Sequence, residues 1–322
     1  MSHMTNPLAT PDQLYQRRSF SSLPAELQDA IIFSSQCLTQ AAGVLLQLPQ
    51  SATAQANVIL ARYWLVEPFM SHEFSDISAA SLYLVAKLGP SPRSPRDISN
   101  VYTYLLSPAS TLFRSPPSLP PLRSITSTTL SESAYQAFHS RILAAEARIL
   151  YALSFNTHVS LPHPLAVTYL QAMDFLGVRK ERIAKRVLAY LNTALLSPQM
   201  LYLTSQPNAL AVAAIYNAAK DVGAKMPECE WWEVFDVDRE ELGFLVVGMR
   251  SVEGWARKMR EDVPRLGQGM ISRRTVEEEM EKKRGLGVGN GSGGGQGGGE
   301  LDVEAEMARK MDEKMAEMEG VA

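Results

Sequence analysis

The stretch "LTQAAGVLLQLPQSATAQANVILARYWLVEPF", Leu38 to Phe69, decides how the first half of the chain folds. Apolar residues recur every three or four positions on both sides of Pro49, which is the spacing of one helix face. A proline cannot continue a helix, but it is tolerated where the next helix begins. We therefore expect two helices that meet at Pro49, with only a short connection between them.

Three further helices are expected in the same half of the chain. The segment "SDISAASLYLVAKLG" ends at Gly89-Pro90, and "PRDISNVYTYLL" opens at Pro95. The segment "LSESAYQAFHSRILAAEARILYALSF" runs from Leu130 to Phe155, after a stretch rich in proline and serine that indicates a long loop. Together with the two helices around Pro49, these segments predict a set of five helices.

The second half of the chain repeats this plan. The segment "PNALAVAAIYNAAKDVG", Pro207 to Gly223, is rich in small residues and nearly apolar on all sides, so we expect a central, buried helix. Strand-type alternation is absent from the sequence. Two successive sets of five helices, each with an Ala-rich third member, indicate an internal repeat.

These patterns predict an all-α chain of two tandem five-helix domains, with an N-terminal helix and a flexible C-terminal tail. Residues 1–22 are polar and are expected to be a disordered segment, whose "MSHM" start resembles the remnant of a tag. The two domains are expected at 23–158 and 159–260. Residues 261–322 are expected to hold a charged helix, a Gly-rich linker and a terminal helix.

Composition excludes several classes of protein. The formal net charge of -3 argues against strong binding to nucleic acid, which usually needs a basic excess. The only two cysteines, Cys37 and Cys229, are too few for a disulfide framework or a zinc site and favour a reducing intracellular setting. No apolar run approaches the roughly 18–20 residues needed to cross a bilayer. We expect no direct contact with nucleic acid and no membrane segment.

No catalytic signature is visible in the chain. Gly289 to Gly294 matches G-x-G-x-x-G, but it lies in a glycine-rich linker with no strand before it. The five histidines form no set of metal ligands, and His158 and His163 are expected to make hydrogen bonds between the two helical sets. The sequence therefore predicts no catalytic residue, no cofactor and no metal site.

Two charged residues share a helix face with apolar neighbours. Lys87 ends an otherwise apolar helix, three positions after Leu84, and Glu146 lies in mid-helix, four positions before Leu150. A lone lysine at the C-terminus of a helix usually only complements the helix dipole. On the residues alone, this reading is favoured for Lys87.

The opening stretch, together with "AAEARILYALSF" and "LPHPLAVTYLQAM", resembles an L-type cyclin over roughly residues 23–259. The resemblance implies two tandem cyclin-box domains and a non-catalytic regulatory subunit. Such a subunit would bind and activate a cyclin-dependent protein kinase of the PITSLRE type, in transcription and pre-mRNA splicing in the nucleus. The implied assembly is a heterodimer with the kinase, and a third subunit is left open.

The resemblance also implies a kinase-binding surface. The family's signature lysine and glutamate match Lys87 and Glu146, and its apolar kinase-facing positions match Leu84, Leu150 and Phe155. Where the family commonly has an acidic pair after its lysine, this chain has Gly89-Pro90. The substrate-docking "MRAIL" motif and an arginine-serine-rich tail are both absent.

Two alternatives remain at this stage. Within the resemblance to cyclins, the K-, T- and C-type transcriptional cyclins are the alternative, and they would imply an RNA polymerase II C-terminal-domain kinase as the partner. A module like transcription factor IIB uses the same pair of five-helix folds to hold DNA and polymerase. That family begins with a cysteine-rich zinc ribbon, which is not visible here.

Overall fold

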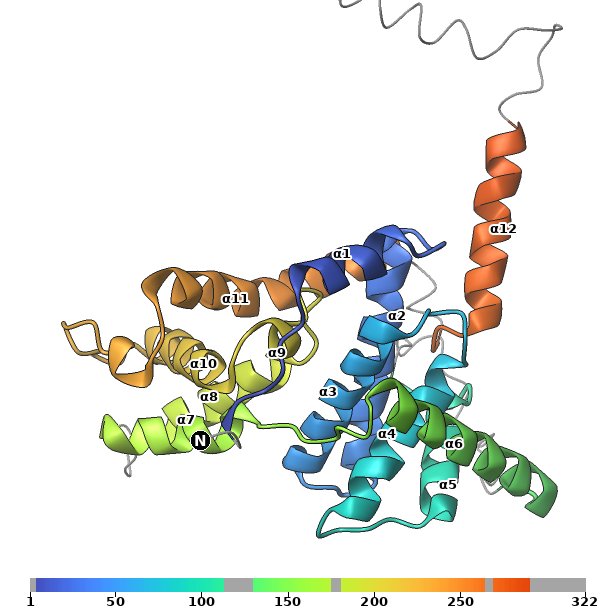
Figure 1. Cartoon of the computed structure of the whole chain (residues 1–322), viewed down its shortest axis with the longest axis horizontal. Coiled ribbons are helices and arrows are strands. Elements are labelled where there is room, and N and C mark those ends of the chain that lie inside the picture. Colours follow the sequence, from blue (N-terminus) through green and yellow to red (C-terminus); the bar gives the residue numbers. More distant parts are fainter. Residues whose placement is uncertain (1–3, 113–129, 175–180, 264–268, 290–322) are drawn as a thin grey trace, which may run out of the picture. The chain divides into compact units, whose positions relative to one another are not determined.

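The computed structural model describes residues 4–112, 130–174, 181–263 and 269–289, and every regular element in these ranges is a helix (Figure 1). The all-α expectation is therefore confirmed. The chain divides into two compact units, Met1–Glu277 and Glu278–Ala322. The first unit contains both helical sets. The expected terminal helix and residues 290–299 of the expected Gly-rich linker lie outside the described residues, whereas residues 285–289 of that linker are the last part of a helix.

The helices follow the predicted order along the chain, except that the short helix Leu201–Thr204, which was not expected, makes the Ala-rich helix the fourth of its set rather than the third. A first helix precedes the two sets, and a charged helix follows them. The first set is α2 (Ala25–Leu45), α3 (Gln50–Val66), α4 (Phe74–Leu88), α5 (Pro95–Leu106) and α6 (Glu132–Ala152). The second set is α7 (Pro162–Ala172), α8 (Glu181–Ala194), α9 (Leu201–Thr204), α10 (Pro207–Val222), the 3-10 turn η4 (Glu233–Phe235) and α11 (Arg239–Asp262), while α1 (Pro11–Ser19) precedes and α12 (Arg273–Gly289) follows.

The connection between α2 and α3 is as short as the sequence predicts. Helix α2 ends at Leu45, and Pro49 is the extended N-cap residue of α3. The chain reverses because Gln47 takes a left-handed backbone conformation and the Leu48 N–H donates to the Gly43 carbonyl at 2.9 Å. A Cβ atom at Gly43 would lie 2.2 Å from Thr53 Oγ1, so only glycine permits this approach of the two helices.

Helix α4 is the central helix of the first set and contacts α2, α3, α5 and α6. Its Ala-rich middle is fully buried, because small side chains allow neighbouring helices to approach from all sides. The buried Ser78 hydroxyl bonds to Thr39 Oγ1 of α2 at 2.7 Å and to the Tyr102 hydroxyl of α5 at 2.8 Å. This chain of hydrogen bonds satisfies three polar groups within the core and joins three helices.

Helix α10 has the same role in the second set, as its apolar sequence predicts. It contacts α7, α8, α9, α11 and η4, and its residues from Ala209 to Ile215 are all buried. The buried Asn217 amide donates to the Val246 carbonyl at 3.2 Å and accepts from Arg250 Nε at 2.6 Å. These bonds hold α10 against α11.

Polar contacts from α3 hold the segment that connects the two sets. The Arg62 guanidinium donates to the His158 carbonyl at 2.7 Å, and the Gln55 amide donates to the Thr157 carbonyl at 3.1 Å. Burial lowers the pKa of Arg62. On another side, Phe33 of α2 and Trp255 of α11 meet edge to face with ring centroids 5.3 Å apart.

The expectation of disorder for residues 1–22 is wrong for the described part, residues 4–22. Helix α1 forms there with a capping box, in which Thr10 and Gln13 satisfy each other's backbone N–H groups. Asn6 is buried, because its side chain exchanges two hydrogen bonds of 2.8 Å with the backbone of Ser160, while its own backbone exchanges hydrogen bonds with the Gln206 side chain. Tertiary contacts of this kind are invisible in a local polar pattern.

The expected hydrogen bond from His163 to the first set is not found among the described residues: His163 bonds to Asn192 of its own set, and Asn192 makes the contact with the first set. His163 Nε2 lies 3.0 Å from Asn192 Oδ1, which also accepts a hydrogen bond from the Gln50 amide of α3 at 3.0 Å. Desolvation lowers the pKa of His163, and the bond to Asn192 opposes this only in part. The other expected histidine, His158, contributes its backbone carbonyl to the Arg62 contact described above.

The close approach at Gly43 predicts a strong effect of a single methyl group. Gly43→Ala should destabilise the fold by about 1–3 kcal/mol, because Thr53 is short, buried and unable to move without its backbone. Urea unfolding measures this free energy. The matched control is Gly254→Ala in α11, where a Cβ would meet nothing within 4 Å and helix propensity predicts a gain of up to about 1 kcal/mol. A silent Gly43→Ala variant would contradict the packing described.

The lowered pKa of His163 predicts a loss of stability in acid. Below about pH 6.5 the unfolded chain binds a proton at this histidine that the folded chain resists, so the free energy of unfolding falls as the pH falls. We expect His163→Gln, measured against the original chain by urea unfolding between pH 7 and pH 5, to reduce this slope by up to about 1.4 kcal/mol per pH unit. Parallel curves for the two proteins would refute the assignment.

Candidate partner-binding site

The structure brings the two predicted charged residues together. Lys87 lies in the last turn of α4, where its charge complements the helix dipole, and its Nζ forms an ion pair with Glu146 Oε1 in the middle of α6. The Glu146 side chain is only 7% exposed, while that of Lys87 is 40% exposed. The pair is therefore buried at its acidic end and open to solvent at its basic end.

Further contacts fix the position of this pair. The Lys87 ammonium lies 5.4 Å from the centre of the Tyr83 ring, one turn earlier on α4. Near the start of α4, Asp76 forms a second ion pair with Arg141 of α6 at 2.9 Å. Two ion pairs thus join α4 and α6. The end of α4 and the middle of α6 therefore form one rigid surface rather than two independent elements.

The three apolar residues of the predicted site occupy different environments. Leu84 is only 1% exposed and belongs to the core, so the expectation that it faces a partner is not met in this conformation. Although Leu84 lies only three positions before Lys87, the helix turns it inward, toward the packed side of α4. Leu150 is half-buried, and Phe155 is 63% exposed.

Phe155 lies in a turn that directly follows α6. Its backbone is left-handed, with a φ of 61°, and its N–H donates to the Leu150 carbonyl at 2.8 Å. Glycine adopts this conformation more readily than phenylalanine does. The ring packs edge to face on Tyr151, with centroids 5.7 Å apart. An exposed aromatic pair in a strained turn marks a candidate contact surface.

Sequence reasoning missed three residues of this surface. Leu88, Leu143 and Tyr151 are large, apolar and exposed. Leu143 and Tyr151 lie eight positions apart on α6, with Ala147 between them, so they share one helix face. That spacing was present in the sequence. Because a buried face has the same spacing, only the structure shows that this one is open to solvent. We call Lys87, Leu88, Leu143, Leu150, Tyr151 and Phe155 the α4–α6 surface.

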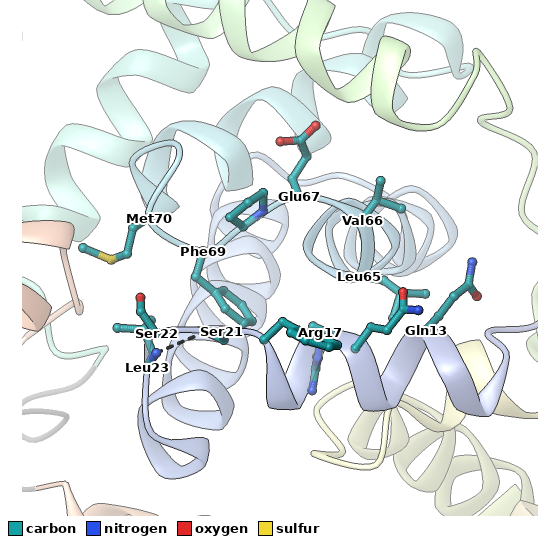
Figure 2. Close-up of a pocket in the computed structure, with 13 residues that line it drawn as sticks. Gln13, Arg17, Ser21, Ser22, Leu23, Leu65, Val66, Glu67, Phe69 and Met70 are labelled. Atoms are coloured by element: carbon teal, nitrogen blue, oxygen red, sulfur yellow. Dashed lines mark hydrogen bonds between the residues drawn. The ribbon is translucent and has the colours of Figure 1, made fainter.

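No arrangement of side chains typical of an enzyme active site is apparent in the described residues. No group of three His, Cys, Asp or Glu side chains in them could hold a metal ion, and none of their helices is long and apolar enough to cross a membrane. Figure 2 shows a cavity between α1, the end of α3 and residues 67–70, into which Leu65, Phe69 and the stem of Arg17 project. This cavity contains none of the residues of the α4–α6 surface.

Comparison with known proteins identifies relatives over most of the chain. Cyclin-L2 of Homo sapiens is 30% identical over 252 residues, which cover 77% of this chain and 45% of that protein. Cyclin-L1 of Gallus gallus is 31% identical over 206 residues, which cover 64% of this chain and 36% of that protein. The chain thus spans about half, or less, of the length of these relatives. No family model matches it.

Solved structures show the same fold. A chain of the yeast RNA polymerase II CTD kinase complex CTDK-1 superimposes with a TM-score of 0.63 and 14% identity, over 80% of this chain and 76% of that one. A viral cyclin from Herpesvirus saimiri superimposes with a TM-score of 0.50 and 14% identity, over 77% and 94%. The fold is therefore that of cyclins, and the curated relatives that the sequence matches over most of its length are L-type cyclins.

The different burial of Leu84 and Phe155 predicts different effects on stability. Leu84→Ala should cost about 2–5 kcal/mol of unfolding free energy, because it leaves a cavity in the core. Phe155→Ala should change the unfolding free energy by less than about 1 kcal/mol, because the ring is exposed. Urea unfolding of both variants measures the contrast, and a larger loss for Phe155→Ala than for Leu84→Ala would show that their environments have been misassigned.

Proposed function

We propose that this chain is the regulatory subunit of a cyclin-dependent protein kinase of the PITSLRE type, which it binds and activates as a heterodimer. Its similarity to L-type cyclins supports this choice of partner, and with it a role in transcription and pre-mRNA splicing in the nucleus. Two neighbours in fold come from complexes described as a CTD kinase and as CAK, which supports a kinase as the class of partner.

The α4–α6 surface is the proposed site of kinase binding. The observation that carries this assignment is the ion pair between Lys87 and Glu146, bordered by exposed apolar side chains. Glu146 orients the Lys87 ammonium, whose remaining N–H donors are available to carbonyl or carboxylate oxygens of a partner. Leu150 and Phe155 supply apolar area beside this anchor, and the buried Leu84 supports it from below.

Activation follows from a shift between two states of the partner. A kinase holds ATP productively only when the lysine of its third strand pairs with the glutamate of its αC helix. A rigid surface that packs only against the inward position of αC stabilises that position. Moving such an element from 1:99 to 99:1 needs about 5.5 kcal/mol of differential affinity. A nanomolar complex has a total binding free energy of about 12 kcal/mol, so the requirement can be met.

Rigidity of the surface is essential to this mechanism. If α4 and α6 moved independently, part of the binding energy would be lost in ordering them. The two ion pairs between these helices and the buried contacts of α4 already order both helices when the cyclin folds. Binding therefore does not have to supply the free energy of ordering them. The proposed domains, 23–158 and 159–260, then have different roles, and the first carries the kinase surface.

A charge reversal at Lys87 tests the proposal. Lys87→Glu should weaken kinase binding by several kcal/mol, because it places two carboxylates side by side and removes the anchoring ammonium. Biolayer interferometry against a purified PITSLRE-type kinase measures the affinity, and phosphorylation of a peptide substrate measures activation. Parallel titrations against the kinase partners of K-, T- and C-type cyclins test the choice of kinase.

Two controls make the result specific. Lys225→Glu makes the same charge reversal on the loop after α10, where an exposed pair with Glu228 contributes little, and should leave binding unchanged. Thermal unfolding of the Lys87→Glu protein is measured first, and its affinity is interpreted only if the protein unfolds in the same transition as the original chain. A folded Lys87→Glu variant that binds the kinase as tightly as the original chain would exclude this surface.

A further inference from the structure

A second charged site lies in the other helical set, away from the residues assigned to the kinase. Arg182, Arg186 and Tyr190 follow one another at intervals of four residues on α8, so they share one face of the helix. Arg250 of α11 lines the same cavity, which has a volume of about 650 Å³. We call this site, together with Asp221 at its floor, the arginine pocket.

Two arginines of this pocket, Arg186 and Arg250, are held in place before any ligand arrives. The Asp221 carboxylate accepts hydrogen bonds from Arg186 Nε at 2.8 Å, from Arg250 Nη2 at 2.6 Å and from the Tyr190 hydroxyl at 2.7 Å. Desolvation alone would raise the pKa of Asp221, but these bonds outweigh it, and the pKa lies below its usual value. The carboxylate therefore stays ionised and fully engaged.

The Tyr190 ring and the Asn217 amide complete this arrangement. The guanidinium carbons of Arg186 and Arg250 lie 5.2 and 6.0 Å from the centre of the Tyr190 ring. Arg250 Nε also donates to Asn217 Oδ1 at 2.6 Å. Both guanidinium groups are nevertheless about half exposed, so N–H donors that are not turned toward Asp221 remain open to the pocket.

The pocket carries an excess of positive charge. Three arginines face two carboxylates, Asp221 and Glu253, and Glu253 also lies 3.8 Å from Arg257 on its own helix. Within the described residues, Arg182 makes no hydrogen bond or ion pair. Arg186, Asp221 and Arg250 are sufficient to join α8, α10 and α11. The third arginine on this face, Arg182, is not needed for that purpose.

We propose that the arginine pocket binds the phosphate group of a phosphorylated serine or threonine in a peptide. Planar guanidinium groups bind phosphate oxygens in a bidentate manner, and a phosphorylated side chain carries close to two negative charges at neutral pH. The cavity accommodates one such side chain, whereas a nucleic acid would need a longer basic surface than this acidic chain offers. None of these residues belongs to the α4–α6 surface, so the proposal does not depend on the kinase.

The first measurement titrates the whole chain with inorganic phosphate while the arginine Nε–Hε signals are followed by NMR. Saturable shifts of the Arg182 and Arg186 signals are expected. The second measurement uses fluorescence anisotropy with a degenerate pool of labelled peptides that share one central phosphoserine, and with the same pool lacking the phosphate. Only the phosphorylated pool should bind, and inorganic phosphate should compete with it.

Three variants test the residues. Arg182→Ala should weaken binding of the phosphorylated pool about tenfold or more, without loss of stability, because one charge-assisted contact is removed. Arg186→Lys keeps the charge but not the planar fork, and should weaken binding by a smaller factor. The matched control, Arg96→Ala, removes an exposed arginine that pairs with Glu132 in the first set and should bind like the original chain.

Four outcomes would overturn the proposal. Absence of saturable phosphate shifts, or equal binding of both peptide pools, would show that the cluster only joins helices. Unchanged affinity in the Arg182→Ala protein would have the same meaning. Tighter binding of a single-stranded RNA pool than of the phosphopeptides, lost in the same variants, would assign the pocket to a polyanion instead.

Discussion

The structure depends on two helices that are covered on nearly every side. Helices α4 and α10 can occupy the centres of their sets only because their inward positions carry alanine, serine and other small side chains. Buried polar groups in such close packing need partners, and the Ser78 hydroxyl of α4 and the Asn217 amide of α10 have them, whereas the buried Ser81 hydroxyl of α4 has no partner among the described residues. Every other helix of the two sets contacts one of these two.

The candidate surface for a partner follows from that arrangement. Because α4 is central, its last turn is the place where it reaches solvent, and there Lys87 meets the buried carboxylate of Glu146. The last turn of α6 then exposes Tyr151, and the turn after it exposes Phe155. A core helix that ends beside an exposed apolar face transmits the rigidity of the core to that face. This property is what a surface that stabilises one state of another protein requires.

The candidate surfaces of the two helical sets expose different kinds of side chain. The first set exposes apolar side chains around a single ion pair, while the second exposes guanidinium groups ordered by Asp221. The connection between the sets is held by α3 and by the N-terminal segment, through Arg62 and Asn6, which also bond to each other. Contacts of both kinds keep the sets in one compact unit.

The sequence by itself determined the class of fold, the order of the helices and the resemblance to L-type cyclins. These features are local, because Pro49, Gly89-Pro90 and the apolar spacing each determine the conformation of only the few residues around them. It also identified Lys87 and Glu146, although only through the resemblance. Only the tertiary structure decided that these two residues pair, that Leu84 is buried while Phe155 is exposed, and that the N-terminal segment is ordered. The reason is physical: burial and pairing depend on which distant helix covers a face, and helical spacing is the same whether a face is covered or open.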